Sequence, residues 1–186
     1  IQLCLMMAQL ANGGYEINPR IIDDKYILQK TIDAWRQEFS NINNKDVNLS
    51  SDEIKKLYRN QENIKFVLDA LYGATNEPMG TSYRSRLSKE EYIYAGKTGT
   101  SQIRTISEEE RELDLKQKDL PYERRDHALF VAFAPYKNPR YAISVVVEHG
   151  GTGSSAAAPL GKKVIKKVLD RHQLRKKYQL DLFQEA

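Results

Sequence analysis

Apolar residues recur every three or four positions in three separate segments, which predicts three amphipathic helices. The first segment opens the chain at residues 1–10 and stops at Asn12-Gly13-Gly14, where glycines supply the left-handed backbone that ends helices. The second segment has the clearest pattern, with apolar positions from Ile64 to Tyr72, and Gly73 is expected to end it.

The third helix is expected after Gly150-Gly151-Thr152-Gly153. Ser154 or Ser155 is expected to cap its start, and Pro159 fits the first turn, where no backbone N–H is required. Its apolar positions from Leu160 to Leu169 share one half of the helix surface, and lysines occupy the other half. One face of this helix is therefore expected to pack on a core while the other faces solvent.

Three short apolar runs rich in β-branched and aromatic residues predict strands. Tyr92 to Ala95 leads into Gly96-Lys97-Thr98-Gly99-Thr100-Ser101, and two further runs cover His127–Ala134 and Arg140–Glu148. The last two are separated by Pro135-Tyr136-Lys137-Asn138-Pro139, which favours a turn between antiparallel strands. The pattern predicts a three-stranded antiparallel meander.

Other stretches lack such regularity. Residues 20–28 are expected to be extended, and residues 29–61 form a polar insertion that is expected to make small surface helices. Between Ser107 and Asp126, eight acidic and five basic residues occupy a span that is long for a loop between two strands. Such a loop is expected to be either mobile or functional.

The composition is that of a folded domain but does not by itself indicate a function. The chain has 186 residues, 40% of them hydrophobic, which suffices for one domain with a core, and its net charge is only +4. The apolar runs are too short to cross a bilayer. A single cysteine, Cys4, excludes an internal disulfide and a cysteine-based zinc site. Because a helix is already under way at Ile1, a fragment of a longer protein is expected.

The strongest chemical signal is Lys97-Thr98-Gly99-Thr100 on a predicted strand. A lysine, two hydroxyls and a glycine on an exposed strand edge can receive a carboxylate and an extended peptide together. A phosphate-binding loop needs a glycine six residues before the lysine, and that position holds Glu91, so the phosphate-loop interpretation fails.

With its neighbouring segments, this tetrapeptide resembles the third motif of penicillin-binding proteins. The chain is similar to class B enzymes of the penicillin-binding protein 2 type in five stretches: Gln2 to Gly14, Ala95–Gln102, Arg125–His127, Ala132 to Pro139 and Glu148–Ser154. The resemblance implies an α/β (α+β) fold of the serine β-lactamase/transpeptidase kind, with an antiparallel sheet flanked by helices. Residues 1–170 are expected to be the C-terminal part of the transpeptidase domain, and residues 171–186 a basic tail.

The family implies peptidoglycan D,D-transpeptidation in cell-wall elongation and shape maintenance. A serine of a Ser-x-x-Lys motif attacks the D-Ala-D-Ala end of a stem peptide, and an amine of a second strand accepts the acyl group. No serine or threonine of this chain precedes a lysine by three residues, so the nucleophile and its lysine are expected upstream and the chain alone is expected to be inactive.

By the same resemblance, four residues carry the site. Lys97 supplies positive charge, the hydroxyls of Thr98 and Thr100 hold the substrate carboxylate, and Gly99 keeps the edge open. The Thr100 N–H donates to the oxyanion. No metal or cofactor is implied. The expected partners are stem peptides, β-lactams and a membrane glycosyltransferase, in a periplasmic domain anchored to the cytoplasmic membrane.

Two other function classes stay open. A non-catalytic relative would bind muropeptides or β-lactams as a sensor, which the missing Ser-x-x-Lys motif permits. Nucleic-acid binding would use the local +7 charge of residues 160–177, but no base-reading or stacking motif accompanies these lysines, so it is not expected. His127 and His149, at strand ends, are expected to have structural roles.

Overall fold

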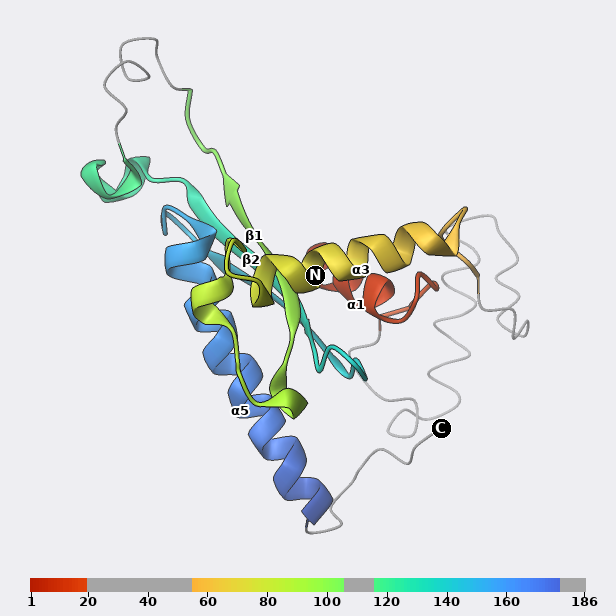
Figure 1. Ribbon diagram of the computed structural model, residues 1–186. Helices are drawn as coiled ribbons and strands as arrows, with labels where there is room; N and C mark the ends of the chain where they lie inside the picture. Colours follow the sequence, from red (N-terminus) through yellow and green to blue (C-terminus); the bar gives the residue numbers. More distant parts are fainter. Residues whose placement is uncertain (20–54, 106–115, 178–186) are drawn as a thin grey trace, which may run out of the picture.

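A three-stranded antiparallel sheet organises the chain (Figure 1). The computed structural model describes residues 1–19, 55–105 and 116–177. The strands are β1 (Ala95–Ser101), β2 (His127–Ala134) and β3 (Tyr141–Val147), in the spatial order β1-β2-β3. The predicted meander is confirmed. The extended piece at 20–28, residues 29–54 of the polar insertion and residues 107–115 of the charged loop lie outside the described residues.

Helices cover both faces of the sheet, because side chains alternate across each strand. On one face, Ala95, Val131 and Phe133 are buried against Met7 of α1 (Gln2–Ala11) and Leu71 of α3 (Gln61–Asn76). On the other face, Ala128, Phe130 and Ala132 are buried against Ala158, Ile165 and Leu169 of α5 (Ala158–Lys177). The sheet is therefore the middle of three layers (Figure 1).

The ends of α1 and α3 test the predicted helix boundaries. Helix α1 ends as expected, because Gly13 and Gly14 adopt φ of +93° and +89°. The prediction that Gly73 ends α3 is wrong: this glycine keeps helical backbone and the helix continues to Asn76. The Asn76 amide donates to the carbonyls of Tyr72 and Tyr94, at 3.1 and 2.9 Å, which ties the last turn of α3 to the segment before β1.

The start of α5 also differs from the prediction. A π-helical turn, η6 (Gly153–Ala157), precedes it, so Ser154 and Ser155 lie inside this turn and do not cap the helix. Thr152 takes the cap position, and its carbonyl accepts a hydrogen bond from Ser155 Oγ at 3.2 Å. Pro159 does lie in the first turn of α5. The helix runs through residue 170 to Lys177, past the expected start of the tail.

Strand β1 begins later than predicted. Glu90–Tyr92 forms a 3₁₀ turn, and pairing with β2 starts at Ala95 opposite Phe133. The Lys-Thr-Gly-Thr sequence therefore lies inside the strand and is paired along its whole length.

Candidate active site

The four predicted site residues lie together on the outer strand of the sheet. Lys97 pairs with Val131, Thr98 with Phe130, Gly99 with Leu129 and Thr100 with Ala128. Within the part of the chain that the structure describes, β2 is the only strand beside β1. Lys97 and Thr100 are exposed and Thr98 and Gly99 are half-buried, so the motif presents an accessible strand edge.

Backbone hydrogen bonds show which residues turn toward that edge. The carbonyls of Tyr94 and Gly96 accept from Asn76 and Thr75 of α3 instead of from β2, and the Thr98 carbonyl accepts from Lys97 Nζ at 2.9 Å. In an antiparallel strand, both backbone groups of a residue point to the same side and the side alternates. The N–H groups of Thr98 and Thr100 are therefore directed away from β2.

A third threonine, which the sequence did not reveal, adds its hydroxyl to the two of the motif. Thr98 Oγ1 donates to Thr81 Oγ1 at 3.0 Å. Thr81 belongs to the segment between α3 and β1. Seventeen residues separate the two threonines, and no spacing rule links them; only the folding of this loop onto β1 does.

The loop that carries Thr81 is held by buried hydroxyls. Thr75 Oγ1 donates to the Gly96 carbonyl and lies 3.2 Å from Ser82 Oγ, and Ser82 Oγ donates to the Ala74 carbonyl at 2.9 Å. Tyr94 adds an anchor, since its hydroxyl donates to the Ser85 carbonyl and burial raises its pKa well above the usual value. These contacts fix Thr81 beside β1.

Behind the edge, η6 packs directly on the backbone of Gly99. A Cβ on Gly153 would lie 2.3 Å from the Leu129 oxygen and 2.5 Å from the Gly99 oxygen, so only glycine fits there. At Gly99 itself, a Cβ would meet only Leu129 Cβ, at 3.4 Å. Packing within the described residues therefore requires the glycine of η6 more strictly than the glycine of the motif.

Polar contacts brace the end of the β1–β2 pair. The buried Asp126 carboxylate accepts from Gln117 Nε2 at 2.7 Å and from the Ile103 N–H at 3.3 Å, and its carbonyl accepts from the Gly151 N–H. The structural interpretation of the histidines is confirmed: His127 Nδ1 accepts from the His149 N–H at 3.0 Å, and His149 Nδ1 lies 3.1 Å from the Arg125 carbonyl.

Among residues 1–19, 55–105 and 116–177, no three His, Cys, Asp or Glu side chains come close enough to hold a metal ion. Over the same ranges, none of the helices combines the length and the apolar character needed to cross a bilayer.

Comparison with known proteins places this geometry in one family. Residues 1–166 match the family model "Penicillin binding protein transpeptidase domain". The peptidoglycan D,D-transpeptidase MrdA of Salmonella typhimurium is 38% identical over 104 residues, which is 56% of this chain and 16% of that protein. MrdA of Acinetobacter baumannii is 30% identical over 159 residues, 84% of this chain and 20% of that protein. The chain thus spans about a sixth to a fifth of the length of these relatives.

Solved structures agree with the sequence match. Pseudomonas aeruginosa PBP2, in complex with WCK 5153, superposes with a TM-score of 0.54 at 29% identity, over 89% of this chain and 28% of that one. Penicillin-binding protein A from M. tuberculosis, as an imipenem acyl-enzyme complex, has a TM-score of 0.51 at 21% identity, which supports the fold alone. The fold class expected from the resemblance is confirmed, and the chain belongs to the penicillin-binding protein transpeptidase family.

Proposed function

We propose that this chain is the C-terminal part of the transpeptidase domain of a peptidoglycan D,D-transpeptidase, and that its Lys97–Thr100 edge binds the D-Ala-D-Ala end of a stem peptide or a β-lactam that mimics it. The observation that carries the proposal is the open edge of β1, where a lysine, two threonine hydroxyls and two outward N–H groups lie within four residues.

Each residue has a role that follows from its chemistry. The Lys97 ammonium supplies the positive charge near the reacting groups, and its bond to the Thr98 carbonyl keeps it beside the strand. The hydroxyls of Thr98 and Thr100 bind the substrate carboxylate. The Thr100 N–H donates to the oxyanion that forms when a nucleophile attacks the carbonyl carbon.

An extended peptide can add to β1 as a further strand. Unpaired backbone groups on a sheet edge give such a peptide its main-chain hydrogen bonds. Gly99 carries no side chain that would hold the peptide away from the backbone. This role supports glycine at position 99, where packing alone would admit a Cβ.

The wider setting follows from the family. Names of relatives such as "Peptidoglycan D,D-transpeptidase MrdA" support transpeptidation by the whole protein. We infer that the serine of an upstream Ser-x-x-Lys motif attacks the stem peptide, releases the terminal D-Ala and passes the acyl group to an amine. We place residues 1–170 in the domain and 171–186 beyond it. The whole protein is proposed to act in the periplasm, anchored to the cytoplasmic membrane, beside a membrane glycosyltransferase in cell-wall elongation.

A fluorescent penicillin tests this function. The whole protein, as its gene encodes it, and the isolated 186-residue chain are labelled side by side on one gel. Labelling of the whole protein and not of the chain is expected. Labelling that is absent from the whole protein, under conditions in which it still binds unlabelled penicillin, would instead support a sensor on the same fold.

A further inference from the structure

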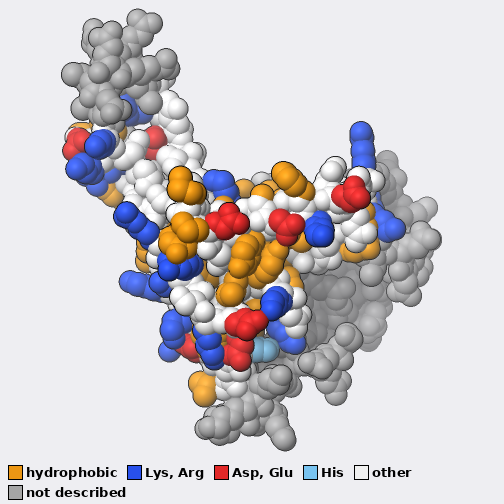
Figure 2. All heavy atoms as spheres, in the orientation of Figure 1, with side chains coloured by type: hydrophobic (Ala, Val, Ile, Leu, Met, Phe, Trp, Pro, Cys, Tyr) orange, Lys and Arg blue, Asp and Glu red, His pale blue; other side chains and the backbone are white. Residues whose placement is uncertain are grey.

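A hollow of about 750 Å³ lies between the loop that precedes β1 and the first turns of α5. One wall comes from Pro78 and residues 80–85, and the other from Ser154, Ser155 and α5 as far as Lys166. Small-molecule sites usually have volumes of several hundred Å³. Figure 2 shows Lys and Arg side chains gathered along this flank of the molecule, over α5.

The lining of this hollow is strongly basic. Arg84 contributes from the loop, and Lys162, Lys163 and Lys166 contribute from α5, where their spacing keeps them on neighbouring parts of the helix surface. None of the described residues that line the hollow is acidic. Several positive charges therefore share one concave surface.

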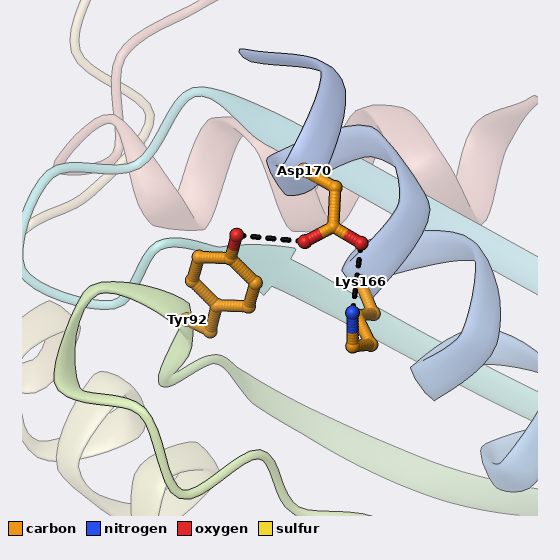
Figure 3. Close-up of polar contacts among 3 residues, drawn as sticks. All are labelled: Tyr92, Lys166 and Asp170. Carbon is orange, nitrogen blue, oxygen red and sulfur yellow. Dashed lines mark hydrogen bonds and ion pairs between the residues drawn. The ribbon is translucent and has the colours of Figure 1, made fainter. Parts of the chain in front are cut away.

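One of the four cations is already neutralised. Lys166 Nζ donates to Asp170 Oδ2 at 2.8 Å, and the other oxygen of that carboxylate accepts from the Tyr92 hydroxyl at 2.7 Å (Figure 3). Among the described residues, no carboxylate pairs with Arg84, Lys162 or Lys163. Three positive charges are left for a ligand.

Both walls are fixed before any ligand binds. The Ser82 N–H and hydroxyl both donate to the Ala74 carbonyl, which holds the loop on the end of α3. Across the hollow, Gly161 lets α5 lie against Phe130, since a Cβ there would be 2.5 Å from the ring. A preformed site loses little conformational entropy when a ligand enters.

We propose that this hollow binds a small polyanion of the diphosphate class. Lysine is a compact point charge that suits phosphate oxygens, and arginine adds a planar fork of N–H donors. Hydroxyls of Thr81 and Ser154 lie on the same lining and can donate to further oxygens. A ligand with three negative charges balances the three unpaired cations, whereas a single carboxylate balances only one.

Calorimetric titration of the whole protein with inorganic pyrophosphate at low ionic strength tests the site. We expect saturable binding of one equivalent, and Lys163→Gln or Arg84→Gln is expected to weaken it about tenfold. Lys167→Gln is the matched control, because it removes the same charge from the same helix outside the hollow. The pyrophosphate affinity of this control is expected to stay within about twofold of that of the parent.

Three results would overturn the proposal: no pyrophosphate binding, equal losses in Lys163→Gln and Lys167→Gln, or penicillin labelling that slows in Lys163→Gln as much as pyrophosphate binding weakens. The last result would make the hollow part of the peptide site.

A second experiment measures binding to vesicles of phosphatidylcholine with phosphatidic acid. Vesicle binding that weakens in Lys163→Gln would identify the ligand as a lipid headgroup. If the protein binds pyrophosphate but not the vesicles, the ligand is a soluble anion.

Discussion

At the scale of single residues, Gly99 and Gly153 pack against each other, but glycine is needed at the two positions for different reasons. Gly153 is required by packing, because a Cβ there would overlap the carbonyl oxygens of Leu129 and Gly99. Gly99 has room for a Cβ at 3.4 Å from Leu129, so the proposed reason for glycine is the approach of a ligand to the strand. A substitution at Gly153 is therefore expected to affect mainly stability, and a substitution at Gly99 mainly ligand binding.

Gly99→Ala is expected to leave the fold nearly intact and to impair binding. The added methyl group makes an ordinary contact, so the free energy of unfolding should change by less than about 1 kcal/mol. Penicillin acylation of the whole protein should slow by about tenfold or more, because the methyl group holds the ligand off the strand edge. Urea unfolding and a labelling time course measure the two effects, and unchanged labelling would contradict the role given to Gly99.

Gly153→Ala is expected to destabilise the fold. Backbone oxygens at 2.3 and 2.5 Å from the new Cβ cannot rotate away, so η6 or β1 must shift, at a cost of about 1–3 kcal/mol. Ser154→Ala is the control, because Ser154 lies in the same turn and is exposed. Its free energy of unfolding should stay within about 0.5 kcal/mol of that of the parent. Chemical denaturation of both variants gives the comparison, and equal stabilities would disprove the close contact.

The Tyr92–Asp170–Lys166 cluster predicts a pH dependence of stability. Hydrogen bonds from Lys166 and then from Tyr92 hold the pKa of Asp170 below its ordinary 3.8, so its contribution is present above that pH and is lost as pH falls through the lower folded-state pKa. The bond to Asp170 raises the pKa of Tyr92, so the tyrosine contributes below pH 10 and loses this contribution at higher pH.

Asp170→Asn should therefore lower the stability slightly at pH 7, and the difference from the parent should shrink below pH 4. Denaturant melts at several pH values measure this difference. A gap between the two proteins that does not change from pH 7 to pH 3 would show that the ionisation of Asp170 does not contribute to stability.

At the scale of elements, the sequence predicted which segments form helices and strands better than where each begins and ends. The meander follows from local alternation and the Pro135–Pro139 turn, and the helices follow from their apolar spacing. The ends of α3 and α5 depend on tertiary contacts: Asn76 bonds the Tyr94 carbonyl, and Gly153 is drawn onto β1. No local pattern reports such contacts.

The packing of α5 on β2 includes a close approach of Gly161 to the Phe130 ring. Gly161→Ala places a Cβ 2.5 Å from Phe130 Cδ1 and should destabilise the protein by about 1–3 kcal/mol. Phe130→Leu removes the ring edge. The double variant Gly161→Ala/Phe130→Leu should therefore lose clearly less stability than the sum of the losses of the two single variants. Stability measurements on the four proteins of this cycle test the contact, and simple additivity would show that the helix does not press on the ring.

At the scale of the whole molecule, the candidate site combines what sequence motifs reveal with what only folding brings together. Lys97 to Thr100 stand out in the sequence because four consecutive residues carry the chemistry. Thr81 contacts Thr98 from 17 residues earlier in the chain, and Gly153 of η6 packs behind Gly99 from 54 residues later, so only the structure reveals these two contacts. The basic hollow likewise needs the pairing of the α3–β1 loop with α5.

The central claim is that the exposed edge of β1 receives the peptide or β-lactam, and the rate of penicillin acylation of the whole protein tests it most directly. The parent, Lys97→Ala and, as a control, Lys65→Ala on α3 are compared at equal concentrations. Lys97→Ala should acylate about 10²–10³-fold more slowly, as is typical when one charged or oxyanion-binding donor is removed, while Lys65→Ala should match the parent. If Lys97→Ala were acylated as fast as the parent, the role assigned to the Lys97–Thr100 edge would be wrong.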